Sequence, residues 1–520
     1  MLAVRILSLV AIALAVLKAE SAASPPCGPR VRRPYSKLTA TEKETLQLAF
    51  EAAMLQGHHH RFVTVHQYSL NEYEAHSCMF LYWHRRFLWG YENMLRSLGE
   101  RFKCLTIPYW DYAGMSSNQL DPNVTCDSLA TCNPVLVDFG ASSISNPSSY
   151  VIGGTPGTAN GGETISADNC VHDPTNPVTR SFCESEAAFQ SKRCLRCIPR
   201  GNWHNAQIAA DTTLASMSNQ IFASSFAELT KNLMYKVHPK IHANLDGAMG
   251  TMSSPSDPVF FLHHATIDAL LSIYTKCQAP YASGTDPKVF PPSDWNLFNN
   301  RVCGPYVFRP KSSSPRFSLS RNSMSMLYYN GTTDVASVDV GDPESPLAQY
   351  FSSTSKNYMA YYRYPQSSTI SYDFTDTGFD VINSNCEAWI GGSYNSTESS
   401  AALMKDIKKT TSKQKKHRDG PPLPVVKQID FTQNVYKHTK RYIKDDKKAR
   451  EYVEMMLCVH RNECMGGVFD YSAEFKKSFK WSLSPYCYNV LDDIAQGRKH
   501  IPVPGWAKLI METYGCRNMS

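Results

Sequence analysis

The sequence predicts a mainly α-helical protein with long disulfide-tied loops and a small, separate C-terminal domain. Four stretches in the first 280 residues place apolar side chains at helical spacing. The region between residues 113 and 200 is rich in Ser, Asn, Gly and Pro, and 16 cysteines are spread along the chain. A chain of 520 residues is long enough for one large domain and a smaller one, each with its own buried core.

Residues 1–23 are typical of a cleavable signal peptide. Arg5 precedes the apolar run ILSLVAIALAVL, and mostly small residues follow from Ala19 to Ala23. The apolar run is too short to span a bilayer comfortably, and no later stretch approaches the required ~20 apolar residues. We therefore expect a secreted, extracellular protein with no stable membrane insertion.

The cysteines agree with an oxidising compartment. Their number is even, and they extend from Cys27 to Cys516, as expected of disulfide bonds in an exported protein. Cys194 and Cys197 form a CxxC pair, but no second pair lies nearby, so the sequence argues against a zinc site there. Four glycosylation sequons also fit secretion, at Asn123, Asn330, Asn395 and Asn518.

The positive charge belongs to one segment of the chain. The formal net charge is +7, and residues 405–450 contain 15 Lys and Arg against 5 Asp. That segment contributes +10, so the rest of the chain carries −3. A basic linker does not make a nucleic-acid-binding surface, and we expect no nucleic-acid partner.

The predicted helices follow one another along the first half of the chain. The run TATEKETLQLAFEAAMLQ at 39–56 begins with a capping residue, either Thr39 or Thr41. A second helix, WHRRFLWGYENMLRSL, spans about 83–98, and helical patterns return at 204–242 and 261–276. Short alternating strands and turns are expected from about 300 to 385.

Composition divides the chain after this region. Residues 24–385 form the predicted main domain, and 386–425 are polar, basic and Pro-containing, as in an exposed linker. Residues 426–520 carry helical patterns together with four cysteines, which predicts a small disulfide-stapled domain: Cys458, Cys464, Cys487 and Cys516.

The informative histidines lie in two clusters. The first lies between the first two predicted helices and comprises His58, His59, His60, His66, His76 and His84. The second comprises His238, His242, His263 and His264. His238 and His242 are four residues apart, so on a helix they share one face and can hold one metal together. Each cluster can supply three imidazoles.

The ligand type narrows the choice of metal. Imidazole suits copper, zinc, iron and nickel alike. A structural zinc site in an exported chain would usually include Cys, and a hydrolytic one would normally bring a carboxylate. Two all-histidine, three-ligand sites leave coordination positions open on both metals. That arrangement suits two Cu(I) ions that bind O2 between them.

Several segments resemble the copper motifs of tyrosinases. AHSCMFLYWHRRFLWGYENMLR at 75–96 resembles the first copper motif, and IPYWDY at 107–112 resembles the stretch that follows it. HPKIH at 238–242 and DPVFFLHHATID at 257–268 are similar to the two parts of the second copper motif. The resemblance covers about 40–380. It implies a four-helix bundle core that holds two copper ions.

The resemblance also implies the ligands. The first copper would take His66, His76 and His84, with His60 as the alternative to His66, and the His58–His60 run is otherwise expected to pack or face solvent. The second copper would take His238, His242 and His264, because the second His of the HH pair is the ligand in the family.

The same resemblance implies roles for residues that surround the predicted ligands. Asp268 resembles the family Asp that pairs with the Arg after the third ligand, here Arg85, which would tie two copper helices together. Phe260 is either the aromatic residue that keeps the coppers dry or a plain core residue. Trp83 and Trp110 are expected in the core.

The implied activity is oxidation of small phenolic substrates by O2, with melanin-type pigment as a product of the family reaction. In tyrosinases a Glu and an Asn are thought to hold a water that takes the phenol proton. Pro239 stands where the Asn is expected, and Glu228 is a tentative water-holding base whose alternative is a surface role. We therefore expect o-diphenol oxidation to exceed monophenol hydroxylation.

Two other functions and one regulatory device remain open at this point. An oxygen carrier resembling a molluscan haemocyanin unit would use the same copper pair, and a copper-free structural protein is the second alternative. Residues after about 420 are expected to form an inhibitory cap, which an activating protease would release by cutting within 405–427, since KQKKHR at 413–418 suits a trypsin-like enzyme. The alternative is a passive stability or interaction module.

Overall fold

The structure is a computed structural model. It describes residues 27–76, 79–119, 124, 126–143, 145–154, 162–223, 226–278, 324–329, 335–356, 361, 370–384 and 424–515. The predicted signal peptide, the four sequons and nearly all of the predicted linker lie outside these residues. No helix in the described part of the chain is long and apolar enough to cross a membrane.

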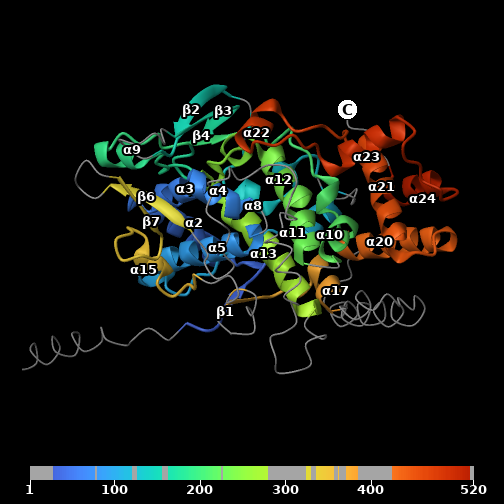
Figure 1. Cartoon of the computed structure of the whole chain (residues 1–520), viewed down its shortest axis with the longest axis horizontal. Helices are drawn as coiled ribbons and strands as arrows, with labels where there is room; N and C mark the ends of the chain where they lie inside the picture. The colour runs from blue at the N-terminus through green and yellow to red at the C-terminus, as the bar shows by residue number, and fades with distance from the viewer. Residues whose placement is uncertain are drawn as a thin grey trace, which may run out of the picture.

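The main domain is built around helices, as predicted (Figure 1). Helix α2 (Ala40–Leu55) begins at a capping box, in which Thr39 and Glu42 each satisfy the other's backbone N–H. Thr39, rather than Thr41, is therefore the cap. The long helices α5 (Phe80–Ser97) and α13 (Val259–Gln278) pack against each other in one hydrophobic core. Short helices α3 (His59–Gln67) and α4 (Ser69–Ala75) connect α2 to α5.

The helical region predicted at 204–242 consists of three separate helices. These are α10 (Leu214–Ile221), α11 (Phe226–Tyr235) and α12 (Val237–Leu245), preceded by the turn η3 (Ala210–Thr212). Pro239 falls in the first turn of α12, where a missing N–H costs no intrahelical hydrogen bond. Two more single turns, η4 (Ala248–Gly250) and η5 (Ser254–Ser256), lead from α12 into α13.

The loop-rich region is tied by disulfides, as predicted. Bonds join Cys126 to Cys132, Cys170 to Cys197 and Cys183 to Cys194. Both members of the CxxC pair are thus in separate disulfides. The region also holds short elements, namely α6 (Tyr112–Asn118), α7 (Leu129–Cys132), α8 (Pro134–Asp138), α9 (Glu186–Ser191), β2 (Ser148–Ile152), β3 (Glu163–Ala167), β4 (Asn169–Val171) and β5 (Ile198–Arg200).

Every sheet in the described residues has two strands. β2 pairs with β3 and β4 with β5, both antiparallel. β1 (Arg30–Arg32) pairs in parallel with β8 (Ile370–Tyr372), which joins the two ends of the main domain. β6 (Ser325–Tyr329) and β7 (Val335–Asp339) form a hairpin in the predicted short-strand region, which also contains α15 (Ala348–Phe351) and α17 (Gly378–Ser384). Turns η1 (Tyr35–Lys37) and η2 (Glu100–Phe102) complete the domain, with a disulfide between Cys27 and Cys104.

The C-terminal region is helical and carries a disulfide between Cys458 and Cys487. Its helices are α20 (Pro424–Tyr442), α21 (Asp446–Cys464), α22 (Ala473–Ser478), α23 (Tyr486–Ala495) and α24 (Trp506–Tyr514). Most of them lie at one end of the molecule (Figure 1), and α22 contacts η4 of the main domain. Glu454 of α21 joins the two regions through an ion pair of 3.1 Å with Lys236.

Candidate metal centre

The six histidines predicted to bind copper are all buried, none more than 5% exposed. They come from five neighbouring helices: His66 from the end of α3, His76 immediately after α4, His84 from α5, His238 and His242 from α12, and His264 from α13. Elements far apart in the sequence therefore contribute to one site, since α5 and α13 pack directly on each other.

The first predicted triad is compact. The ring centroid of His66 lies 5.3 Å from that of His76 and 5.6 Å from that of His84, and His76 and His84 are 6.1 Å apart. Among the described residues, however, the one group that places three or more ligand atoms within 4.8 Å of one another is the second cluster.

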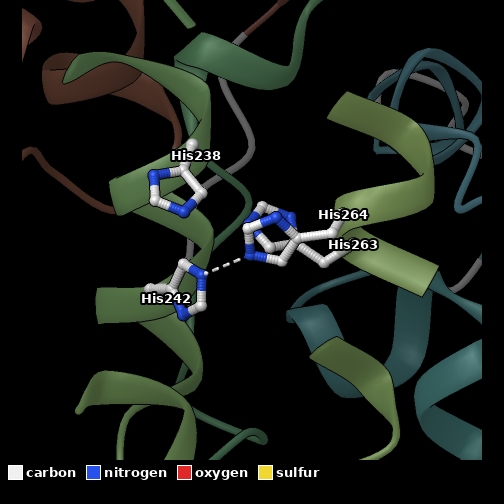
Figure 2. A group of neighbouring side chains, drawn as sticks. All are labelled: His238, His242, His263 and His264. Carbon is white, nitrogen blue, oxygen red and sulfur yellow. Dashed lines mark hydrogen bonds between the residues drawn. The ribbon is translucent and has the colours of Figure 1, made fainter. Parts of the chain in front are cut away.

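The second predicted triad is more compact. Centroid distances are 4.7 Å for His238 and His242, 5.1 Å for His238 and His264, and 5.6 Å for His242 and His264. The Nε2 atoms of His242 and His264 lie 3.4 Å apart (Figure 2). Two imidazole nitrogens bound to one tetrahedral metal at about 2.0–2.1 Å would be about 3.3 Å apart. This pair therefore has the spacing of two ligands of one ion.

The two triads adjoin. The rings of His84 and His264 stack at 4.2 Å, and the ring of His84 lies 6.4 Å from that of His238. Helices α5 and α13 thus bring a member of each triad into ring contact. A site of this form can hold two metal ions side by side.

Backbone carbonyls orient three of the imidazoles. Nδ1 of His66 lies 2.8 Å from the Met252 carbonyl, and Nδ1 of His242 lies 2.7 Å from the Met249 carbonyl. His84 makes the equivalent contact with the carbonyl of Phe80, one turn earlier in α5, at 2.9 Å. A carbonyl can only accept, so each Nδ1 carries the proton and each Nε2 offers a lone pair.

Other nitrogens of the cluster lack partners. Nε2 of His84 and the Nδ1 atoms of His76, His238 and His264 are buried with no hydrogen bond to the described protein atoms. A buried polar atom without a partner costs about 1–3 kcal/mol. A metal ion is the partner that the bare Nε2 of His84 fits, because its other ring nitrogen is already bonded.

Burial keeps the imidazoles neutral, as metal binding requires. It lowers the pKa of His66 to about 4 and that of His242 to about 3, even though each has a carbonyl partner that favours the charged form. Burial also lowers the pKa of the other four predicted ligands well below the usual value. Six neutral nitrogen donors without a thiolate or carboxylate among them fit a pair of copper ions.

Comparison with known proteins agrees with this geometry. The common central domain of tyrosinase matches residues 56–277, which include all six histidines. Residues 56–277 are thus similar to the central domain of tyrosinases. Tyrosinases of Streptomyces glaucescens and Streptomyces antibioticus are 25% and 26% identical over 251 and 267 residues, covering 46% and 49% of this chain and 80% and 86% of the relatives. A solved polyphenol oxidase from Thermothelomyces thermophila aligns over 69% of this chain and 92% of its own, at 19% identity and a TM-score of 0.36. These sequence matches show a resemblance to tyrosinases, and a dinuclear copper site, as in that family, agrees with the six imidazoles.

A further histidine lies beside the second triad. His263 is fully buried, and its ligand nitrogen lies within 4.8 Å of those of His238, His242 and His264. Its Nδ1 is hydrogen-bonded to the hydroxyl of Tyr112, and its ring stacks on that of His238 at a centroid distance of 5.4 Å. His264 alone of the adjacent pair stacks on His84 of the first triad. The ring of His263 is 4.7 Å from that of His242, and its buried Nε2 has no hydrogen bond among the described residues, so His264 as the ligand of the pair stays a prediction.

The His58–His60 run packs in the structure and does not join the cluster. Nε2 of His60 lies 2.7 Å from the Glu186 carboxylate, so the alternative ligand to His66 has another partner. His59 is held between the Tyr91 hydroxyl at 2.7 Å and the Ser256 carbonyl at 3.0 Å.

The predicted tie between copper helices is present. Arg85 of α5 donates to the Asp268 carboxylate of α13, and both side chains are at most 3% exposed. The same carboxylate accepts hydrogen bonds from Arg32 of β1, at 3.3 Å, and from the hydroxyl of Tyr372 in β8. The β1–β8 ladder is therefore anchored to the helix that carries His264. The sequence motifs did not indicate Arg32 or Tyr372.

Aromatic rings line the cluster on two sides. Phe260 is fully buried in the core, and its ring lies 5.2 Å from that of His66 and 4.1 Å from that of His264, so it contacts both triads. Phe80 lies 4.5 Å from His238 and 4.9 Å from His84, and it was not singled out from the sequence although it lies within the first motif. Trp83 and Trp110 are buried in the core, as predicted.

Among the described residues, no contact joins Glu228 to the histidine cluster. Its carboxylate lies 3.2 Å from Nζ of Lys447 on α21 and is partly exposed. This contact fits the surface role that the sequence offered as the alternative. It does not support the predicted role of Glu228 as a water-holding base. Pro239 is buried beside His238, as its position in the motif requires.

One residue of the C-terminal region reaches the site. The ring of Phe479, directly after α22, lies 5.8 Å from that of His76 and 5.9 Å from that of His242. It is buried with Tyr471, Phe475 and Trp481. Phe479 therefore contacts one predicted ligand of each metal. No sequence motif indicated it, because the contact depends on how the C-terminal domain docks.

Proposed function

We propose that this chain is a secreted copper-dependent phenol oxidase that oxidises o-diphenols to o-quinones with O2. The observation that carries the proposal is the pair of adjoining all-histidine triads. His66, His76 and His84 would hold one copper, and His238, His242 and His264 the other. Two observations support copper redox chemistry over zinc hydrolysis. Residues 56–277 match the central domain of tyrosinase, and the six predicted ligands include no carboxylate or thiolate.

When bound, the copper pair would supply electron exchange between the phenol and O2. The protein's own part is to hold neutral imidazoles at fixed orientations and to exclude water. The carbonyls of Phe80, Met249 and Met252 set the orientation of three rings. Phe80 and Phe260 cover rings of both triads with apolar surface.

The substrate class follows from how a phenol can lose its proton. A phenol with a pKa of about 10 needs help near neutral pH. A bound water that takes the proton needs at least two polar partners. Pro239 offers none through its side chain, and Glu228 is paired with Lys447. We therefore favour o-diphenols as substrates, with monophenol hydroxylation weaker, and pigment of the melanin type as a product.

We further propose that the protein is made in a latent form. Phe479 sits against His76 and His242, and Ser478 and Lys480 on either side of it are hydrogen-bonded to the main domain, Lys480 to Glu72 at 2.8 Å. An aromatic ring held there would occupy the approach of a phenolic ring. A tethered domain has an effective concentration of roughly millimolar, so it blocks efficiently until the linker is cut. A protease cutting within 405–427 would release it.

The alternative function is oxygen binding without catalysis, as in a haemocyanin-like protein. The same six imidazoles would serve it, and a permanently seated Phe479 would favour it by excluding phenols. Turnover after release of the C-terminal domain separates the two functions.

Oxygen uptake tests the proposal. The chain would be produced with copper, cleaved with trypsin in the linker, and given catechol. We expect oxygen consumption that requires both copper and cleavage. Copper-loaded, cleaved and folded protein that binds O2 but does not consume it with catechol would establish the carrier function instead.

A further inference from the structure

A short segment between α12 and α13 positions ligands of both predicted metals. Residues 248–256 contain η4 and η5, and we call them the ligand-positioning segment. The Met249 carbonyl holds His242, and the Met252 carbonyl holds His66. Two single turns have few hydrogen bonds of their own, so their geometry depends on what anchors them from outside.

One peptide unit carries both the contact to His66 and the anchor. The carbonyl of Met252 and the N–H of Ser253 belong to the same planar peptide group, so fixing the direction of one fixes the other. The Ser253 N–H donates to Oε2 of Glu163 at 2.9 Å, and the Ser253 hydroxyl donates to the same oxygen at 2.8 Å. The peptide plane is therefore held on one side by Glu163 and on the other by His66.

Further contacts immobilise this anchor. Ser253 is fully buried, and its hydroxyl also accepts a hydrogen bond of 2.6 Å from Gln67, the residue after His66. The second oxygen of Glu163 accepts from Ser478 of the C-terminal domain. Ser478 in turn accepts from the Met252 N–H at 3.0 Å. Glu163 itself lies at the start of β3, in a hairpin that no copper motif includes.

We propose that Glu163 is a positioning residue for the first copper site, acting on His66 through the Met252–Ser253 peptide. This inference rests on the proposed function, because it assigns His66 as a copper ligand. A carboxylate that accepts from the peptide N–H polarises the carbonyl, which then accepts more strongly from Nδ1–H of His66. The result resembles a carboxylate–histidine–metal arrangement with one peptide unit inserted.

The arrangement predicts an effect on one copper of the two. His66 depends on the Met252–Ser253 peptide, whereas His242 depends on the Met249 carbonyl, three residues earlier. Loss of Glu163 should therefore weaken the first site and leave the second nearly unchanged. Residues that support a metal ligand from outside typically contribute about 10–100-fold in affinity.

Copper release from the full, uncleaved chain tests this. Copper-loaded wild-type protein, Glu163→Ala and Glu163→Gln would be mixed with a Cu(I) chelator, and release would be followed over time. We expect one of two coppers to leave Glu163→Ala about tenfold faster than wild type. Glu163→Gln should fall between them, since an amide oxygen can accept the Ser253 bonds but brings no charge.

Two controls separate positioning from stability and from the cap. Glu51 accepts three hydrogen bonds from Arg180 and Ser181 at 2.6–2.9 Å, far from the ligand-positioning segment in sequence, so Glu51→Gln should lower stability without changing copper release. Ser478→Ala removes the hydroxyl that contacts Glu163 and the Met252 N–H but keeps both Ser253–Glu163 hydrogen bonds, so it should accelerate copper release less than Glu163→Ala does.

Several results would overturn the inference. Wild-type release rates from Glu163→Gln would do so, including in the case that Glu163→Ala fails to fold. Equal acceleration of both coppers, matched by Glu51→Gln, would assign Glu163 a general stabilising role. A wild-type chain that binds no copper would instead contradict the proposed function itself, so the two failures are distinguishable.

Discussion

Adjacent histidines on one helix have different surroundings in this site. His264 contacts His84 of the first triad and has its Nε2 3.4 Å from that of His242, whereas His263 is bonded to Tyr112 and stacks on His238. The difference arises because consecutive helical residues point about 100° apart. Their roles should therefore separate by mutation.

We predict that His264→Ala lowers the copper content from two ions per chain to one and abolishes catechol oxidation. His263→Asn should keep two coppers, with a loss of stability of about 1–3 kcal/mol because the buried Tyr112 hydroxyl loses its partner. Metal analysis alongside urea unfolding would measure both effects. Two coppers in His264→Ala and one in His263→Asn would reverse the assignment.

The residue after His238 sets the predicted substrate preference. Because Pro239 offers no polar group, we predict that the cleaved enzyme turns over a monophenol about a hundredfold more slowly than the matching o-diphenol, the contribution typical of an absent proton acceptor. Pro239→Asn should raise the ratio of monophenol to diphenol rates, and Glu228→Gln should leave it unchanged. Rapid tyrosine hydroxylation by the unmodified protein, without a diphenol present, would refute this.

At the scale of the elements, the buried ion pair of Arg85 with Asp268 joins α5 to α13, and Arg32 and Tyr372 also donate to the Asp268 carboxylate. We predict that Asp268→Asn costs about 3 kcal/mol of unfolding free energy and reduces bound copper, because uncompensated buried arginines loosen the helices that carry His84 and His264. Thermal unfolding and metal analysis would measure the two effects.

A neighbouring pair offers a matched control. Arg86, next to Arg85 on α5, forms a buried pair with Asp339 of β7 at 2.8 Å. Asp339→Asn should cost similar stability but keep both coppers, because β7 carries no ligand. Equal copper loss in the two variants would show that the helix tie has no special role at the site.

The sequence predicted the elements best where a local rule applied. The Thr39 capping box, the helix around His84 and the HxxxH on α12 all follow from residues close together in the chain. The region 204–242 was predicted to have helical character, and its described residues form three helices that end at Ile221, Tyr235 and Leu245. Pro239 did not break the pattern, since it lies in a first turn.

The parts of the site that the sequence did not predict depend on long-range docking. The carbonyls of Met249 and Met252 orient two ligands, yet a backbone group leaves no signature in residue identity. Phe479 reaches the histidines from more than two hundred residues beyond the second motif. Glu163 lies in a hairpin whose pairing with the ligand-positioning segment no local pattern reveals.

At the scale of the whole molecule, the C-terminal domain contacts the main domain through polar groups and an aromatic cluster, and the ring of Phe479 in that cluster reaches the predicted ligands. We predict that Phe479→Ala raises catechol oxidation by the uncleaved chain, because the domain stays docked through contacts such as that of Lys236 with Glu454 while the ring is removed. Phe469→Ala, a substitution at an exposed position of the same domain, should have no effect.

Cleavage of the linker gives a second test of the inhibitory role of the C-terminal domain. Limited trypsin digestion within 405–427 should raise the rate of the wild-type chain and add little to that of Phe479→Ala. An unchanged wild-type rate after cleavage, with the main domain still folded, would show that the C-terminal domain is a passive stability module.

The central claim is that two triads of imidazoles hold two coppers, and the metal content of the purified chain tests it most directly. Protein produced with copper and freed of loosely bound metal would be analysed by mass spectrometry of the intact folded chain. We predict two copper ions per chain, falling to one in His84→Ala and in His242→Ala. A single ion, zinc in place of copper, or a wild-type content in both variants would contradict the account.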